Sequence, residues 1–550
     1  MESTLEKEKS EKLMKNDKPK VLVSDKLNES GLEIIKQVAD VDYKPGISAD
    51  ELKKIIKDYS ALLVRSQTIV TKEIIEACSP SMKIIGRAGV GVDNIDLEAA
   101  TQKGIIVVNS PEGNTIAAAE HTIAMMMTLA RQIPLADASM KKKEWKRSDF
   151  MGFEMSSKTL GVVGLGKIGT RVGKASLALG MKVLAYDPFV NEEMAKKLGF
   201  ELVGLEEIWK RSDVITFHVP KTKETANLLN AETIKKCKKG VRIINCARGG
   251  IVDEAALAEG IKSGQVGGAA FDVFSEEPVN TNNPLLELGN KVVLTPHLGA
   301  STEEAQLNVA LDVAEQIRDV LSGGLARSAV NLPAMRAETI AQVKPFMSLA
   351  QSLGAVAAQM ADGAIQEIQI EAKGELANKN IDPLVVSVLK GVLSQSVEGV
   401  NFVNAPTIAK ARGIKVIESK SQEAGDFVEE LTVIVKTDKG KKLISGTLLA
   451  QGTPAIVQVD NYSMSATLAE HMLLTHHQDK PGMIAQVSNI LWKGNINISS
   501  MHVGRKGPRE MSVMVLNLDD PMPSELVKQV SKVDGILEAK YVKLSTGESV

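Results

Sequence analysis

Three polar residues with complementary chemistry, Arg248, Glu277 and His297, each stand shortly after an apolar run typical of a buried strand. In a parallel sheet the carboxyl ends of the strands meet at one edge, where ligands bind, so we expect the three side chains to share a site. An imidazole can take a proton near neutral pH, a carboxylate can hold its other ring nitrogen, and a guanidinium can bind a carboxylate through two parallel hydrogen bonds. The set is suited to oxidising a secondary alcohol that carries a carboxylate.

Each residue taken alone also fits a structural role. His297 could cap or pack against a strand end, Arg248 could form a surface ion pair, and Glu277, next to Glu276 and Pro278, could lie in a solvated turn. The catalytic interpretation is favoured because the three residues follow successive predicted strands of the same sheet as a cofactor-binding motif.

That motif extends from Leu160 to Asp187. An apolar run leads into three glycines, Gly164, Gly166 and Gly169, then a helical segment follows, and a second apolar run ends at Asp187. Such glycines allow a tight turn and a close approach to a pyrophosphate, which the N-terminus of the helix can bind. A carboxylate at Asp187 can accept the ribose hydroxyls and repels a 2′-phosphate, so NAD is favoured over NADP. The alternative is a glycine turn with only a structural role, but such a turn does not explain why the second apolar run ends at an acidic residue, Asp187.

The composition excludes several classes of protein. The chain has 550 residues, 44% of them hydrophobic and 24% charged, so we expect several soluble domains. A net charge of −2 and an aromatic content of 3% argue against binding to nucleic acid or to an anionic membrane. The most apolar stretch, 116–130, contains Glu120 and is short for a bilayer span, so no membrane association is expected.

The chain carries three cysteines, Cys78, Cys237 and Cys246, without the spacing of a zinc site, so no metal is expected. An odd and sparse set suggests reduced thiols and a cytoplasmic protein. Cys246 has no base at a suitable spacing, so we assign it a backbone role rather than that of a nucleophile. Residues 1–18 lack the apolar core of a secretion signal and are expected to form a disordered tail.

Apolar strand-like runs alternate with amphipathic segments over much of the chain. Runs at 21–23, 61–64, 83–85 and 105–108 predict a first parallel unit, and six further runs between 160 and 295 predict a second. Beyond 333 a helical stretch is followed by strands at 365–372, 428–437, 441–450 and 455–459. The last part of the chain mixes strands and helices as a small α+β module does.

Several blocks of the sequence resemble the D-isomer-specific 2-hydroxyacid dehydrogenase family, in its long form that ends in an ACT domain. The resemblance covers about residues 20–550 and rests on 87–94, 163–169, 245–250, 271–278 and 296–300. It implies that His297 is the acid–base residue, Glu277 its partner and Arg248 the carboxylate-binding residue. It also implies NAD contacts from these residues: Gly164, Gly166, Lys167, Ile168, Gly169, Asp187, Val219, Cys246, Ala247, Arg248, Asp272, His297, Leu298, Gly299 and Ala300.

The resemblance further implies an activity. The expected reaction is the NAD-dependent oxidation of D-3-phosphoglycerate to 3-phosphohydroxypyruvate, the first step of L-serine biosynthesis, in a homodimer or homotetramer. Arg65, Ser66 and Arg87 match substrate-side positions, and the backbone N–H groups of Gly89, Val90 and Gly91 could bind the carboxylate. Val90 stands where the family often has Thr or Ser, so a side-chain hydrogen bond is lost there.

Two other functions stay open at this point. One is a dehydrogenase or reductase acting on an unphosphorylated acid such as glycerate or hydroxypyruvate. The other is a non-catalytic protein that senses NAD and binds partner proteins. Arg65, Arg87 and the regulatory C-terminal part argue against the first, and the intact catalytic set argues against the second.

The C-terminal part offers an effector site. His477, Asp479 and Asn497 match the positions at which ACT domains of similar dehydrogenases bind L-serine. Asp479 could pair with an ammonium group, or it could only shape the turn before Pro481.

The expected fold class is α/β, with a doubly wound Rossmann-type nucleotide domain inserted in a flavodoxin-like substrate domain, followed by two α+β regulatory domains, the last ACT-like. The expected ranges are 19–110 with 299–330 for the substrate domain, 111–298 for the nucleotide domain, 333–468 for an intervening domain and 469–550 for the ACT domain.

Overall fold

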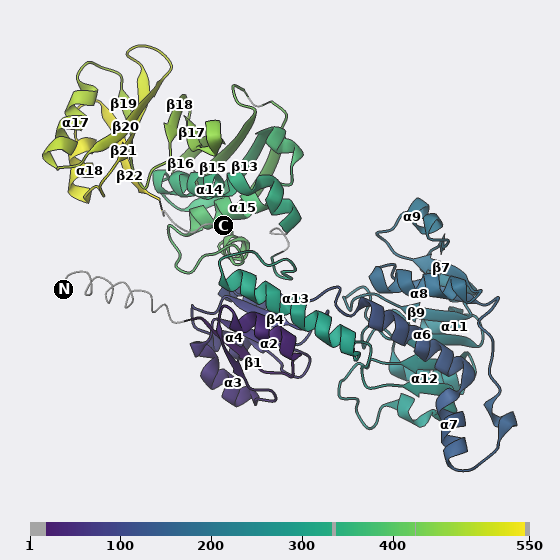
Figure 1. Cartoon of the computed structure of the whole chain (residues 1–550). Helices are drawn as coiled ribbons and strands as arrows, with labels where there is room; N and C mark the ends of the chain where they lie inside the picture. The colour runs from purple at the N-terminus through teal and green to yellow at the C-terminus, as the bar shows by residue number, and fades with distance from the viewer. Residues whose placement is uncertain (1–17, 333–336, 424, 545–550) are drawn as a thin grey trace, which may run out of the picture. The chain divides into compact units, whose positions relative to one another are not determined.

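The computed structural model describes residues 18–332, 337–423 and 425–544 (Figure 1). Nearly all of the predicted N-terminal tail therefore lies outside the described residues. Ser110–Asp312 forms one compact unit, and the other described residues form a second. The division falls inside helix α13 (Glu303–Leu321).

The first sheet of the second unit is parallel, with the strand order β2-β1-β3-β4-β5. This is the flavodoxin-like order. Its central strand β3 is apolar and fully buried, as expected when helices cover both faces. The elements are β1 (Lys20–Val23), α2 (Glu29–Lys36), β2 (Asp40–Tyr43), α3 (Ala49–Ile55), β3 (Ala61–Val64), α4 (Lys72–Ala77), β4 (Ile84–Arg87), α5 (Leu97–Lys103) and β5 (Ile106–Val108).

The unit formed by Ser110–Asp312 is built on a parallel sheet of seven strands in the order β12-β11-β10-β9-β6-β7-β8. This is the doubly wound order of a Rossmann fold, which the sequence predicts, with one short strand more than expected. The strands are β6 (Thr159–Val163), β7 (Lys182–Tyr186), β8 (Glu201–Leu202), β9 (Val214–Phe217), β10 (Val241–Asn245), β11 (Val266–Phe271) and β12 (Val292–Leu294). The helices are α6 (Thr115–Arg131), α7 (Ile133–Lys141), α8 (Lys167–Ala178), α9 (Glu192–Lys197), α10 (Leu205–Arg211), α11 (Ala231–Lys236) and α12 (Glu254–Lys262).

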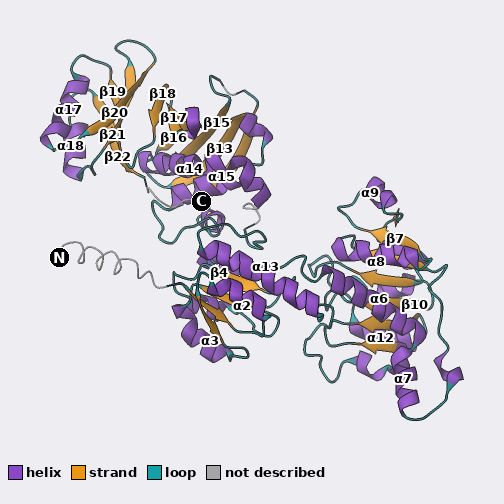
Figure 2. Ribbon diagram, viewed as in Figure 1, coloured by secondary structure: helices purple, strands orange, loops and turns teal. Residues whose placement is uncertain are grey.

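A six-stranded, mostly antiparallel sheet follows in the chain, in the order β14-β13-β15-β16-β17-β18. Helix α14 packs against β15, β16 and β17, and α15 packs on α14 (Figure 2). The elements are α14 (Ala337–Met360), β13 (Ile365–Gly374), α15 (Asp382–Leu393), α16 (Ala405–Ala411), β14 (Lys415–Ser421), β15 (Glu429–Thr437), β16 (Gly440–Leu448), β17 (Pro454–Val459) and β18 (Tyr462–Thr467).

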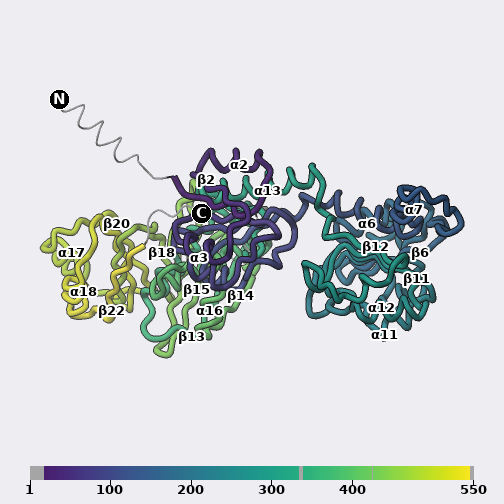
Figure 3. Tube along the Cα trace, turned by 90° about the horizontal axis from the view of Figure 1, so that it is seen from below, coloured from purple at the N-terminus to yellow at the C-terminus, as the bar shows by residue number. Residues whose placement is uncertain are grey.

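The last sheet is antiparallel, with the order β20-β21-β19-β22. Its two helices lie on the same face of the sheet (Figures 1 and 3). The opposite face contributes Met472, Leu474, Val513 and Val515 to the same hydrophobic cluster as the six-stranded sheet. The elements are β19 (His471–Gln478), α17 (Met483–Lys493), β20 (Ile498–Arg505), β21 (Met511–Leu518), α18 (Ser524–Ser531) and β22 (Ile536–Lys543). The predicted α/β and α+β fold class is confirmed.

Candidate functional site

The glycine turn between β6 and α8 leaves room for a ligand. Gly164 has a φ of +98°, and a Cβ there would lie 2.5 Å from the carbonyl oxygen of His218. A Cβ on Gly169 would collide with the carbonyl oxygen of Gly164. Among the described residues other than its chain neighbours, none has an atom within 4 Å of the position of a Cβ on Gly166 or a side chain that caps the N-terminus of α8. The backbone N–H groups at the start of this helix can therefore bind an anion such as a pyrophosphate.

Asp187 lies directly beside this turn, at the end of β7. One carboxylate oxygen accepts the backbone N–H of Leu165 at 2.8 Å, and the other accepts that of Phe189 at 2.9 Å. Both bonds fix the carboxylate with acceptor capacity left for hydroxyl groups. Lys167, in the first turn of α8, forms an exposed ion pair with Glu112.

His297 and Glu277 form the shortest polar contact of the expected catalytic set. The Nδ1 atom of His297 lies 2.6 Å from the Oε2 atom of Glu277, whose other oxygen accepts the backbone N–H of Phe274 at 3.0 Å. Burial opposes ionisation of Glu277, but the hydrogen bonds from His297 and Phe274 outweigh it, so the pKa of this carboxyl lies below its usual value. Because a carboxylate only accepts hydrogen bonds, Nδ1 carries the proton and Nε2 is left as the basic atom.

Asp272 holds the backbone around His297. It is buried, and its carboxylate accepts the N–H groups of Leu298 at 2.7 Å and Gly299 at 2.8 Å. Its carbonyl oxygen accepts the N–H of His297 at 2.9 Å. Ala300 accepts a hydrogen bond from the side chain of Gln306. The segment 297–300 is therefore a fixed loop at the carboxyl edge of the sheet.

Arg248 lies in the loop after β10. The side chain of Asn245 shapes this loop, since it donates to the carbonyl of Arg248 at 2.9 Å and accepts the N–H of Ala247 at 3.1 Å. One guanidinium nitrogen of Arg248 donates to the carbonyl of Ala247. Burial raises the pKa of the Cys246 thiol to about 12, so Cys246 is not a nucleophile at neutral pH. Val219 follows the neighbouring strand β9 and packs against the hydrophobic core of this unit, which includes Phe217 and Ile243.

The expected substrate-side residues lie in the other compact unit, where β3 and β4 are paired with Val64 opposite Arg87. Arg65 and Ser66 follow β3, Arg87 ends β4, and Gly89, Val90 and Gly91 come next. They thus share the carboxyl edge of one sheet.

Polar side chains fix the loop after β3 and the turn after β4. Asp25 accepts the backbone N–H of Arg65 at 2.5 Å, and Asn109 donates to the carbonyl of Val90 at 2.6 Å. A Cβ on Gly89 would collide with the guanidinium of Arg87, so only glycine leaves that side chain its place.

The three expected effector residues are not brought together within one chain. Asp479 follows β19 and accepts hydrogen bonds from the side chain of Arg505 and the backbone of Arg509, each at 3.2 Å. His477 is buried, and burial lowers its pKa. Asn497 donates to Asp519 at 2.5 Å, next to the far end of β21. With His477 opposite Ser512 and Ile498 opposite Leu518, this end lies roughly 20 Å away along the strand.

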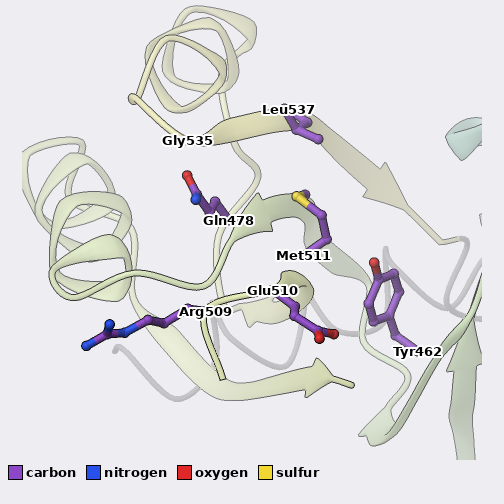
Figure 4. Close-up of a pocket in the computed structure, with 7 residues that line it drawn as sticks. All are labelled: Tyr462, Gln478, Arg509, Glu510, Met511, Gly535 and Leu537. Atoms are coloured by element: carbon purple, nitrogen blue, oxygen red, sulfur yellow. The ribbon is translucent and has the colours of Figure 1, made fainter. Parts of the chain in front are cut away.

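A cavity of about 500 Å³ lies beside the Asp479 turn, between β18 and the last sheet (Figure 4). In it, the Glu510 carboxylate points toward Tyr462, whereas the Arg509 side chain points away. The lining residues are Tyr462, Gln478, Arg509, Glu510, Met511, Gly535 and Leu537.

Sequence reasoning did not find several residues that shape these sites. Asn245 and Asp25 act through hydrogen bonds to loop backbone, and His121 contacts Asp272 from a distant helix. Asn245 and Asp25 carried a sequence signal, because each is a polar residue at or just after the end of an apolar strand. Among the described residues, no group of three or more His, Cys, Asp or Glu side chains could hold a metal ion. No helix in this part of the chain is long and apolar enough to span a membrane.

Comparison with known families identifies three segments. Residues 123–299 match the D-isomer specific 2-hydroxyacid dehydrogenase, NAD binding domain. Residues 342–460 match the D-3-phosphoglycerate dehydrogenase intervening domain, and residues 471–535 match the ACT domain.

Curated relatives match almost the whole chain. The D-3-phosphoglycerate dehydrogenase of Synechocystis sp. is 52% identical over 527 residues, which cover 96% of this chain and 95% of the relative. The enzyme of the same name from Archaeoglobus fulgidus is 44% identical over 529 residues, which cover 96% of this chain and 100% of the relative.

Solved structures match the dehydrogenase part. The TT0316 protein from Thermus thermophilus is 32% identical, with a TM-score of 0.53, and the match covers 56% of this chain and 99% of that one. The D-lactate dehydrogenase from Aquifex aeolicus, solved with NAD and lactic acid, is 31% identical with a TM-score of 0.50, and the match covers 55% of this chain and 96% of that one.

Proposed function

This chain belongs to the D-3-phosphoglycerate dehydrogenase family, and from that premise we propose that Arg248, Glu277 and His297 carry out the NAD-dependent oxidation of D-3-phosphoglycerate to 3-phosphohydroxypyruvate. The observation that carries the assignment is the 2.6 Å contact between His297 and Glu277 at the carboxyl edge of the nucleotide-binding sheet. The reaction would be the entry to L-serine synthesis.

In the proposed mechanism, Nε2 of His297 accepts the proton of the substrate's 2-hydroxyl group while a hydride leaves C2, so that a ketone forms. Glu277 stabilises the imidazolium that results, because its carboxylate already bonds Nδ1. Arg248 binds the substrate carboxylate and sets the orientation of C2. NAD, when bound, supplies the acceptor for the hydride.

The residues around the glycine turn fit NAD. The open space at Gly166 and the uncapped start of α8 suit the pyrophosphate, and Asp187 suits the adenosine ribose. On the substrate side, we assign the binding of anionic substrate groups to Arg65 and Arg87, with Ser66 and the backbone of 89–91 as further donors.

The decisive test is NADH formation, followed by absorbance, with D-3-phosphoglycerate, with unphosphorylated D-glycerate and without substrate. Turnover of the phosphorylated acid alone supports the proposal. A preference for D-glycerate would refute the substrate assignment and leave the oxidoreductase chemistry standing.

We propose L-serine as an inhibitor that binds the ACT domain at His477, Asp479 and Asn497. Since Asn497 lies at the other end of the strands from Asp479 within one chain, the site would be completed by a second copy. A titration should show inhibition that the Asp479→Ala variant loses while its uninhibited turnover is unchanged. Unaltered activity of the wild type with saturating serine would contradict this role.

We also propose a homodimer that pairs through the nucleotide-binding unit. Large apolar side chains on and after α7 are exposed, among them Trp145 at 82% and Met151 at 80%, with Ile133, Leu135 and Met140 nearby in sequence. Exposed apolar clusters of this kind mark interaction surfaces. A Trp145→Glu variant should shift the sedimentation coefficient toward that of a smaller species, and an unchanged coefficient would refute the role of this surface.

We place the protein in the cytoplasm because its three cysteines are free.

A further inference from the structure

The loop that carries His297 depends on one buried carboxylate, Asp272. The backbone of His297 has a φ of +56°, a left-handed conformation that is uncommon for residues other than glycine. The carboxylate of Asp272 accepts the N–H groups of Leu298 and Gly299, and its backbone carbonyl accepts the N–H of His297, so a single residue fixes the backbone on and after the base. A displacement of this carboxylate would therefore release the N–H groups of the two residues that follow His297.

A second histidine, from a different element, contacts the same carboxylate. The Nε2 atom of His121, on α6, lies 3.1 Å from the Oδ1 atom of Asp272 and 3.3 Å from the hydroxyl of Thr295. Thr295 itself donates to Oδ1 at 2.6 Å. Because α6 packs against both β11 and β12, His121 ties the loop to a helix that spans the two strands from which the loop is built.

The environment makes this contact a strong one. The side chain of Asp272 is 1% exposed and that of His121 is 19% exposed. Burial opposes ionisation of Asp272, yet hydrogen bonds from His121, Thr295 and Leu298 lower its pKa below the usual range. Hydrogen bonds to a buried charge are stronger than those between neutral groups and are costly to remove.

We propose that His121 is a positioning residue for the dehydrogenase reaction: its Nε2–H holds Asp272, and Asp272 holds the His297 loop in the reactive conformation. The inference rests on the proposed function, because it assigns to His121 an effect on the base that performs the reaction. His121 does not act on the substrate itself.

The test compares His121→Phe, which keeps a ring and loses the donor, with His121→Gln, whose amide nitrogen can replace Nε2–H. Glu120→Gln, an exposed neighbour on the same helix, is the matched control. We expect the Phe variant to lose about tenfold or more in kcat, since a small misplacement of a catalytic group lowers turnover strongly. The Gln variant should recover most of the loss, and the control should match the wild type.

Hydrogen exchange of the Leu298 and Gly299 amides gives a readout that does not depend on turnover. Exchange should be faster in His121→Phe than in the wild type and close to the wild type in His121→Gln. The proposal is overturned if the Phe variant keeps wild-type kcat and exchange, or if both variants lose the same amount, because packing alone would then be responsible. A wild type that does not turn over D-3-phosphoglycerate would refute the proposed substrate, whereas unchanged exchange in His121→Phe would refute the link from His121 to the loop, so the two failures are distinguishable.

Discussion

Replacing Glu538 with glutamine removes one charge from a cluster of four that joins the ACT sheet to the six-stranded sheet. His476 lies 3.0 Å from Asp460 and 3.1 Å from Glu538, and Lys442 lies 2.5 Å from Glu538. The ring of Tyr462 packs edge-on to His476. All four charged side chains are at least three-quarters buried, so the charges are screened less than surface pairs.

The size of the effect follows from the pKa of Glu538. Burial opposes its ionisation, but the hydrogen bonds from His476 and Lys442 dominate and lower the pKa from 4.5 to about 2. A shift of that size corresponds to about 3 kcal/mol of stabilisation. Because the pKa is lowered on folding, the contribution is complete above pH 4.5 and is lost as the pH falls through 2.

The titration of His476 reduces the stability of the same cluster at higher pH. Burial lowers its pKa, but Asp460 and Glu538 outweigh this and raise it above 6.5. Its contribution is therefore complete below pH 6.5 and is lost as the pH rises through the pKa of the folded state. The junction should be most stable between pH 4.5 and 6.5.

The assay is hydrogen exchange of the β19 and β22 amides in the full chain, converted to local opening free energies. At pH 6 we expect Glu538→Gln to reduce them by about 1–3 kcal/mol. Glu525→Gln, which removes an exposed carboxylate from the same domain, should change them by less than about 0.5 kcal/mol. Equal protection in the two variants, or protection in the wild type that does not fall above pH 7, would refute the reasoning.

Three further predictions concern the catalytic part. Glu277→Gln should lower kcat about 10²- to 10⁴-fold with little change in NAD affinity, because it removes the carboxylate that orients and stabilises His297, and steady-state kinetics with NAD titration will show the split. Asp187→Ala should raise the kcat/KM ratio of NADP to NAD by about tenfold, since it removes both ribose hydrogen bonds and the repulsion of a 2′-phosphate, and an unchanged ratio would contradict the cofactor assignment. Gly169→Ala should weaken NAD binding about tenfold or more by equilibrium titration, because the new Cβ collides with the carbonyl of Gly164.

The sequence alone determined the features whose residues are neighbours along the chain. The β6–α8–β7 unit could be predicted because its apolar runs, glycines and terminal acid are local signals, and the order of the residues after each strand fixed the edge at which Arg248 and His297 lie. Strand β2 escaped prediction because its residues, Asp40–Tyr43, are mostly polar and exposed. In strands β14 and β22 apolar and polar residues alternate too weakly to predict a strand.

Only the tertiary structure decided which distant side chains meet. His121 and Asp272 are joined by the packing of α6 on the sheet, and His476 and Glu538 by strand pairing. The antiparallel register of the last sheet places Asn497 and Asp479 at opposite ends, which no local pattern could reveal. The physical reason is that sequence patterns report which residues are buried and in what periodicity, whereas hydrogen-bond partners depend on strand register and helix packing, which the whole core sets together.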